Sequence, residues 1–378
     1  MKNRLESNKA IFIRSSARPI PRIVRMMHTA QELGYECEFL GAYRETALNK
    51  SDTWSDINIS RVGRYFPLAN GKGMIGYFKG VIVFNYSCFR FLKSVKPAIV
   101  HVSDYDSFLG AWLFCRLFAS KLIYNIHDNL AQRYPIPRFA RAFLNFIEGV
   151  FVLGSDVVLV PEQFRKDALP KFSRRNVYVV RNTPEITGDI SCDVCSAKYD
   201  ADKIRVFFAG WIEKGRGIDA LLTLAEDSRL DIRVAGNGDA DLVDRLKRNS
   251  NIQYLGYLDH AQIIEETKLC HFIYALYDPV REINIYAAPN KLAEALSCGK
   301  PVIINDEVML SKSVLEYDCG VVIPYSRVTE VVDRLADIMS RPERYKDMCD
   351  GARLLFHSSY SWSVAKSAMI NIYKEVMA

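Results

Sequence analysis

The chain has 378 residues, 49% hydrophobic and 25% charged, which is the composition of an ordinary globular protein and a length typical of two domains. Its longest apolar stretch, residues 73–93, is interrupted by Lys79, Asn85 and Arg90, which excludes a membrane-spanning helix and favours a core or surface-lying one. The first residues are too poor in apolar side chains for a signal peptide. Together with 9 scattered cysteines, this predicts reduced thiols in the cytosol.

The two halves of the chain differ in charge. Residues 1–182 contain 27 Lys and Arg against 14 Asp and Glu, a net charge of +13, whereas residues 183–378 contain 23 against 30, a net charge of −7. A basic half suggests an anionic partner such as membrane lipid, a phosphorylated acceptor or nucleic acid, and an ordinary solvated surface is the alternative. No nucleic-acid-binding module with interleaved aromatic residues is recognisable, so we expect no nucleic-acid partner.

Short apolar runs alternate with helical patterns along the first half. They are AIFI, ECEFLG, AIVHV, LIYNI, VVLV and VYVV, and the first two flank the helical pattern RIVRMMHTAQELG. The same rhythm restarts after residue 200 with IRVFFAG, LDIRVAG, NIQYLG, HFIYAL and PVIIN. Continuous apolar runs are typical of parallel strands buried on both faces. The sequence therefore predicts an α/β fold of two doubly wound domains that face each other across a cleft.

Residues 181–203 between the halves are polar and lack periodicity, so they read as a linker. The linker holds one CxxC pair, Cys192 and Cys195, and a structural zinc site needs four ligands, so two incidental cysteines are the favoured interpretation. Three Asp-x-Asp pairs fit helix caps and turns better than metal ligands. They are Asp104 with Asp106, Asp200 with Asp202, and Asp239 with Asp241. We expect no metal and no cofactor.

The segment YAAPNKLAEALSCGKPVII, residues 286–304, has a readable local pattern. Pro289 and Asn290 are helix-start signals, Gly299 suits the left-handed position that ends a helix, and residues 302–304 resemble a buried strand. Glu294 stands four residues after Asn290, whereas a capping box needs the acid at three. Its carboxylate is therefore available for another task.

A dinucleotide fingerprint is not complete in this chain. Gly236 and Gly238 follow a predicted strand, but Asp241 stands where the third glycine is required.

Four segments of the second half occur in the order and spacing of a known family: FFAGWIEKGRGIDALL, LDIRVAGNGDADLVDRL, NIQYLGYLD and PNKLAEALSCGKPVI. They resemble the donor half of the family-4 retaining glycosyltransferases (glycosyl transferases group 1), which have the GT-B fold. The first half resembles that family more loosely, through KPAIVHVSDYD, KLIYNIHDN, SDVVLVPEQF and VYVVRNTPE. The resemblance implies an acceptor domain (1–182), a linker (183–202), a donor domain (203–356) and a terminal helix (357–378) that returns to the first domain.

By the resemblance, the second half binds the donor nucleotide sugar. Lys214 and Arg216 would stabilise its diphosphate, and Glu294 would accept hydrogen bonds from the ribose hydroxyls. A solvated basic turn and a helix-surface acid paired with Lys291 are the alternatives. The other donor-binding residues that we expect are Gly215, Gly217, Gly236, Tyr257, Ala288, Pro289, Asn290 and Lys291.

Two positions depart from the family pattern. Tyr286 stands where many members have a glutamate that contacts the donor sugar, and Trp211 stands where a phosphate-binding arginine is frequent. Contacts to the sugar are therefore expected from backbone amides of residues 287–290. The resemblance does not choose between UDP- and GDP-sugars.

In the first half, His127 follows a strand and resembles the family's histidine beside the donor sugar, where it would take part in catalysis. A structural histidine next to capping residues is the alternative. The first strand–helix loop carries Arg14, Ser15 and Arg18, which could meet donor phosphate or an anionic acceptor.

The resemblance implies metal-independent transfer of a sugar to an acceptor hydroxyl with retention, in which the leaving phosphate helps to deprotonate the acceptor. We expect a lipid-linked or polysaccharide acceptor in bacterial cell-surface glycan synthesis, and an enzyme at the cytoplasmic face of the plasma membrane in contact with anionic lipid. A nucleotide-sugar epimerase or hydrolase with the same fold is one alternative. A basic nucleic-acid-binding protein without enzymatic activity is the other.

Overall fold

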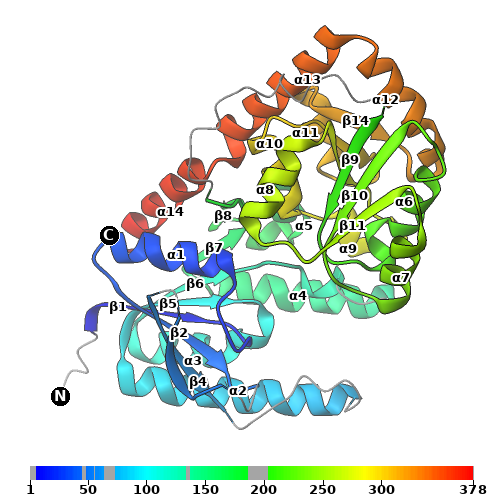
Figure 1. The fold of residues 1–378 in the computed structure, drawn as a ribbon. Coiled ribbons are helices and arrows are strands. Elements are labelled where there is room, and N and C mark those ends of the chain that lie inside the picture. The colour runs from blue at the N-terminus through cyan, green and yellow to red at the C-terminus, as the bar shows by residue number, and fades with distance from the viewer. Residues whose placement is uncertain are drawn as a thin grey trace. The chain divides into compact units, whose positions relative to one another are not determined.

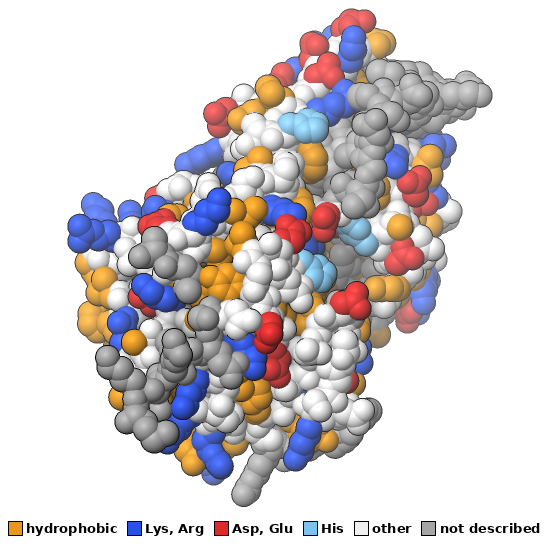
Figure 2. Space-filling model, turned by 90° about the vertical axis from the view of Figure 1, so that its left-hand side faces the viewer, with side chains coloured by type: hydrophobic (Ala, Val, Ile, Leu, Met, Phe, Trp, Pro, Cys, Tyr) orange, Lys and Arg blue, Asp and Glu red, His pale blue; other side chains and the backbone are white. Residues whose placement is uncertain are grey.

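The structure is a computed structural model that describes residues 6–44, 48–54, 56–63, 73–132, 137–185 and 203–377. The chain forms two compact units, Met1–Arg181 with Ala365–Ala378, and Asn182–Val364. The predicted CxxC pair and the pair Asp200 and Asp202 lie outside the described residues. Figure 2 shows hydrophobic side chains exposed beside Lys and Arg on one face of the molecule.

Unit 1 is built on a sheet of eight strands in the order β3-β4-β2-β1-β5-β6-β7-β8 (Figure 1). The strands are parallel except for β3, which runs antiparallel to β4 at one edge. Their bounds are β1 Glu6–Ile13, β2 Glu36–Ala42, β3 Ser51–Trp54, β4 Ile57–Val62, β5 Pro97–Ser103, β6 Lys121–Asn125, β7 Val157–Val160 and β8 Val177–Val179.

The helices of unit 1 cover its sheet and close its core. They are α1 Pro21–Glu32, α2 Gly73–Val95, α3 Phe108–Phe118, α4 Arg138–Leu153 and α5 Gln163–Ala168. The inner sides of α2, α3 and α4 share one buried core with the strands. No helix among the described residues is long and apolar enough to cross a membrane.

The C-terminal helix α14, Trp362–Met377, joins unit 1 from Ala365 onwards, as predicted. The hydroxyl of Tyr178 in β8 donates to Glu375 Oε1 (2.6 Å). The hydroxyl of Tyr373 lies 3.4 Å from Nδ1 of the buried His101 in β5. These contacts attach the helix to the sheet of unit 1.

Unit 2 has a sheet of six parallel strands in the order β11-β10-β9-β12-β13-β14. The strands are β9 Ile204–Ala209, β10 Leu230–Ala235, β11 Ile252–Gly256, β12 Phe272–Ala275, β13 Val302–Asn305 and β14 Gly320–Ile323. The helices are α6 Ile218–Leu224, α7 Ala240–Arg248, α8 His260–Leu269, α9 Glu282–Ile285, α10 Asn290–Ser297, α11 Ser311–Glu316, α12 Val331–Met339 and α13 Pro342–Leu355.

In both units the order of strands along the chain reverses beside the first strand. The reversal lies between β1 and β5 in unit 1 and between β9 and β12 in unit 2. This confirms the predicted doubly wound sheets. In such sheets ligands bind outside the carboxyl ends of the strands at the reversal, so these two places are where a site is sought.

Three strands were missed by the sequence analysis. β3 and β4 form the edge of the first sheet, where polar residues alternate with apolar ones, and β14 forms an edge of the second. β3, SDTW, is polar and β4, INISRV, alternates, so neither has the continuous apolar run by which the central strands were recognised. β14, GVVI, is a short apolar run that was overlooked.

Candidate functional site

In unit 2 the strand order reverses beside β9, and the segment that follows β9 lies at this point. Gly210 has a φ of 146°, and Trp211, which follows it, is 62% exposed. Ile212 then forms an isolated parallel bridge with Gly238. The one-turn 3₁₀ helix η5, Lys214–Arg216, follows the bridge and leads into α6.

Gly215 and Gly217 fit this turn tightly against the segment that follows β12. The carbonyl of Gly215 accepts hydrogen bonds from Asp278 N (3.1 Å) and Asn284 Nδ2 (2.8 Å). Gly217 has a φ of 70°, and a Cβ there would lie 2.8 Å from the carbonyl oxygen of Leu276. Packing and backbone angle therefore explain Gly217, whereas hydrogen bonds to the carbonyl of Gly215 do not by themselves require a glycine. The predicted contact of both glycines with a ligand stays a prediction.

Two cations meet beside this turn. Arg216 lies with its guanidinium carbon 5.3 Å from the ring centroid of the buried Tyr277, and its Nε is 3.2 Å from Glu213 Oε1. Lys291 of α10 is buried, with Nζ 3.9 Å from the ring centroid of Phe208 and 5.5 Å from that of Tyr277. Aromatic faces can hold these cations without neutralising them.

Burial lowers the pKa of Lys291 well below its usual value, the charge of Arg216 lowers it further, and Glu294 opposes the shift. An anion bound beside Lys291 would favour the charged form of its ammonium group. The arrangement is therefore suited to a phosphate-bearing ligand.

Glu294 lies one helical turn beyond Lys291 and is also buried, with 9% of its surface exposed. Burial raises its pKa to about 7, against the opposing charge of Lys291. Oε1 of Glu294 lies 3.6 Å from Nε2 of His260, the first residue of α8. The alternative of a solvent-exposed helix-surface acid is wrong, because only 11% of the Glu294 side chain is exposed.

The other predicted donor-binding residues differ in their surroundings. Lys214 is exposed at η5 and Tyr257 is 75% exposed after β11. Gly236 has a φ of 138°, and a Cβ there would lie 1.8 Å from the carbonyl oxygen of Gly210, so packing between neighbouring backbones alone requires glycine.

The start of α10 differs slightly from the expectation. Pro289 is the N-cap, without a side-chain hydrogen bond, and Asn290 is the first helical residue. Asn290 Oδ1 accepts from Asn182 Nδ2 (2.7 Å). Ala288 is half-buried just before the cap, and Gly299 ends the helix with a φ of 61°, as predicted.

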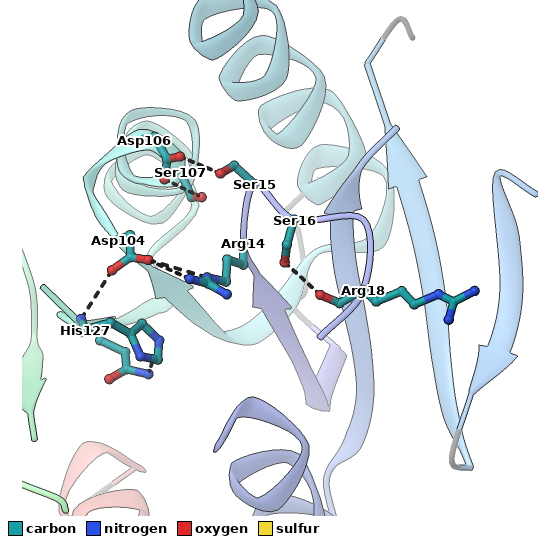
Figure 3. A network of polar contacts seen from close by, with 9 residues as sticks. Arg14, Ser15, Ser16, Arg18, Asp104, Asp106, Ser107 and His127 are labelled. Carbon is teal, nitrogen blue, oxygen red and sulfur yellow. Dashed lines mark hydrogen bonds and ion pairs between the residues drawn. The ribbon is translucent and has the colours of Figure 1, made fainter. Parts of the chain in front are cut away.

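The reversal point of unit 1 brings together residues from three neighbouring strands (Figure 3). Arg14 follows β1, Asp104 follows β5 and His127 follows β6. Asp104 Oδ2 lies 3.3 Å from Arg14 Nη2, and its Oδ1 accepts from His127 N (3.2 Å). Asp104, which has a left-handed φ of 62°, was explained from sequence as a cap or turn, but it makes no side-chain cap bond and instead orients both predicted site residues.

His127 is held neutral at physiological pH. Burial lowers its pKa to about 3, Asp104 opposes this, and Arg22 and Arg14 lower the pKa further. Its Nε2 lies 3.3 Å from Asn125 Nδ2, and Asn125 Oδ1 accepts from Arg22 (3.2 Å). The ring is therefore suited to hydrogen bonding with a sugar hydroxyl, and stabilising charge as an imidazolium is disfavoured.

Ser15 and Arg18, in the loop after β1, make hydrogen bonds that hold the conformation of this loop. Ser15 donates to Asp106, and the backbone carbonyl of Arg18 accepts from Ser16 Oγ (2.7 Å). In Figure 3 the side chain of Arg18 points away from Arg14 and His127.

Comparison with known proteins identifies unit 2. Residues 196–354 match the family model for glycosyl transferases group 1. This unit is a glycosyl transferases group 1 domain. Alpha-D-kanosaminyltransferase of Streptomyces kanamyceticus is 22% identical over 185 residues, 46% of either chain, so this chain spans about half of the length of the curated relative it matches.

Solved structures agree over almost the whole chain. Sucrose-phosphate synthase from Thermosynechococcus elongatus is 14% identical, with a TM-score of 0.77 over 98% of this chain and 99% of its own. HepE of Anabaena, solved in complex with UDP and glucose, is 13% identical, with a TM-score of 0.70 over 97% and 99% of the two chains. The chain has the GT-B fold.

Several polar groups of the group 1 domain were missed from the sequence. Tyr277, Arg281 and Asn284 follow β12 and surround the turn of η5, where Arg281 Nη1 lies 3.5 Å from Glu213 Oε2. The sequence shows that these residues follow a strand. It does not show that this strand, β12, lies beside β9.

Proposed function

We propose that the protein is a retaining glycosyltransferase that moves a sugar from a nucleotide-sugar donor to an acceptor hydroxyl. The observation that carries the proposal is the meeting of Arg216, Lys291 and the buried Glu294 at the carboxyl ends of β9 and β12. Two cations beside a buried carboxylate offer complementary groups to a diphosphate and to the ribose hydroxyls.

The donor would be held by the predicted donor domain, residues 203–356, and the acceptor by the predicted acceptor domain, residues 1–182. Arg216 and Lys291 would contact the diphosphate, with Lys214 at its exposed side, and Glu294 would accept hydrogen bonds from two ribose hydroxyls. Backbone amides within residues 287–290 would contact the sugar, as expected for a member with Tyr286 in place of a glutamate. The complexes of HepE with UDP and glucose, and of a trehalose-6-phosphate protein from E. coli with UDP-2-fluoro glucose, support a nucleotide-sugar donor.

Transfer would proceed on one face of the sugar. The acceptor oxygen bonds to the anomeric carbon as the bond to the diphosphate oxygen breaks, and the acceptor proton passes to the departing phosphate. Arg216 and Lys214 would stabilise the charge that develops on that phosphate. Neutral His127 and Arg14 of unit 1 would orient a sugar hydroxyl and an anionic group, without a metal ion.

The setting that we propose is bacterial cell-surface glycan synthesis, with a lipid-linked or polysaccharide acceptor at the cytoplasmic face of the membrane. The net charge of +13 in residues 1–182 supports contact with anionic lipid.

Thermal unfolding in the presence of UDP- and GDP-sugars tests the donor. A ligand that binds only the folded state raises Tm by mass action, so one nucleotide class should shift Tm and Glu294→Ala should abolish the shift. Glu316→Ala, an exposed glutamate of α11, is the matched control and should keep it. No shift with any nucleotide at millimolar concentration would refute nucleotide-sugar binding.

An acceptor assay separates transfer from its alternatives. Nucleotide release that requires an added glycan or lipid-linked acceptor supports transfer, and the anomeric configuration of the product reports retention. Release or sugar interconversion without any acceptor would instead identify a hydrolase or epimerase.

A further inference from the structure

Helices α2, α3 and α4 form one layer over the sheet of unit 1, visible in cyan and blue-green in Figure 1. The backbone N of Gly110 in α3 donates to Asn85 Oδ1 in α2 (2.8 Å). On the other side of α3, Phe108 stacks on Phe151 of α4 with ring centroids 4.2 Å apart, and Arg116 donates to Gly154 O (2.7 Å). The three helices therefore lie side by side and present one continuous outer face.

The outer face of α4 is apolar, although it is exposed. Its exposed large side chains are spaced alternately four and three residues apart, which puts them on one side of the helix. They are Phe139 (79% exposed), Phe143 (63%), Phe146 (57%), Val150 (46%) and Leu153 (56%). The one acidic residue of α4, Glu148, is buried and accepts from Tyr124 in β6 (2.6 Å). This polarity is the reverse of that of a solvated surface helix.

The neighbouring helices extend the same apolar face. The exposed large side chains of α2 are Phe78, Ile82, Val83 and Tyr86, and those of α3 are Leu109, Leu113 and Leu117. The three helices thus carry 12 of the 21 large hydrophobic side chains that the described residues expose. Single exposed apolar residues need no explanation, but such a concentration marks an interaction surface.

The charges of this face have one sign. Exposed cations come from all three helices: Lys79, Arg90, Lys93, Arg116 and Arg138. Among their described residues, no exposed Asp or Glu accompanies them. Pairing of this face with its copy in a second chain would bring like charges together around the symmetry axis, which opposes a homodimer.

We propose that the outer face of α2, α3 and α4 docks on the surface of a membrane that contains anionic lipid. The proposal deepens the membrane contact of the proposed function and rests on it for its setting. It adds α4 and α3 to residues 73–93, the segment that the sequence indicated. The apolar side chains would enter the boundary between headgroups and acyl chains, and the cations would meet lipid phosphates.

Vesicle co-sedimentation tests the face with the whole protein. We expect binding to vesicles of phosphatidylglycerol mixed with phosphatidylcholine, weakened by salt, and much weaker binding to phosphatidylcholine alone. Replacing Phe139 and Phe143 together by serine should reduce the affinity at least about tenfold. Arg138→Gln should reduce it about fivefold on the anionic vesicles only.

The matched control replaces two equally exposed leucines of unit 2, Leu315 and Leu354 (each 62% exposed), together by serine. This control should bind vesicles as the parent does. Unchanged Tm and an unchanged Tm shift with the nucleotide sugar in both double variants show that folding and donor binding are intact. A failure of vesicle binding is then distinct from a failure of the proposed transfer reaction.

Three results would overturn the proposal. They are absence of vesicle binding by the parent protein, equal binding by the Phe139 and Phe143 double variant, and a dimer in solution that this variant dissociates while vesicles bind neither protein. The last result would assign the face to a second copy of the chain.

Discussion

Replacing Glu294 by glutamine should stabilise the protein without ligand, although it should weaken donor binding. A carboxyl pKa raised from 4.5 to about 7 corresponds to about 3 kcal/mol of unfavourable free energy for the charged form in the folded state. Between these two values the folded state binds more protons than the unfolded one. The stability contributed by this group is therefore complete below pH 4.5, falls as pH rises and is lost above pH 7.

Urea unfolding at pH 5 and pH 8 measures the effect. At pH 8 we expect the free energy of unfolding of Glu294→Gln to exceed that of the parent by about 1–3 kcal/mol, since the amide removes the buried charge but must satisfy its own hydrogen bonds. At pH 5 the difference should be much smaller. Glu316→Gln, at an exposed position, should show no gain at either pH. An equal difference at both pH values, or none at pH 8, would show that burial of the Glu294 charge does not limit stability.

Four further outcomes are expected. Nucleotide-sugar affinity, measured by calorimetry, should fall by about fivefold from pH 7 to pH 6, because protonation removes the carboxylate of Glu294 that accepts from the ribose. In urea unfolding, Gly236→Ala should lower the free energy of unfolding by roughly 3 kcal/mol or more, because the added Cβ would lie 1.8 Å from a carbonyl oxygen. Gly34→Ala is the control: Gly34 has a φ of 89° but no atom within 4 Å of the added Cβ, so the loss should be about 1–2 kcal/mol. Arg216→Gln should lower kcat/KM about 10²-fold in the transfer assay with little change in Tm, and an unchanged kcat/KM would exclude its contact with the leaving phosphate. Asp104→Asn should lower the free energy of unfolding by about 1–2 kcal/mol, because a half-buried ion pair and a charge-assisted bond to a backbone N–H are both weakened.

The central strands of both sheets were predictable because burial on both faces makes their sequences continuously apolar. Val157–Val160 and Val302–Asn305 are strands of this kind, and both are fully buried. The edge strand Ser51–Trp54 was not predictable by the same rule, since most of its residues face solvent. The C-terminal cap at Gly299 was readable because a left-handed φ selects glycine locally.

The buried state of Glu294 and Lys291 could not be read from the sequence. Both stand on a helix with ordinary capping signals, and their spacing also fits an exposed ion pair. Only the packing of α10 against the ring of Phe208, which belongs to a strand more than eighty positions earlier, removes Lys291 from water.

The sequence by itself determined the alternation of strands and helices, the division into two α/β halves and the helix-end glycine, because each depends on local periodicity or on one backbone angle. Tertiary structure alone decided which loops meet. The order of strands in a sheet places Arg14, Asp104 and His127 side by side, and nothing within any one of their segments specifies that order. It also decided that the apolar side of α4 faces outward, because a period of 3.6 residues shows that a helix has an apolar side and leaves open what covers it.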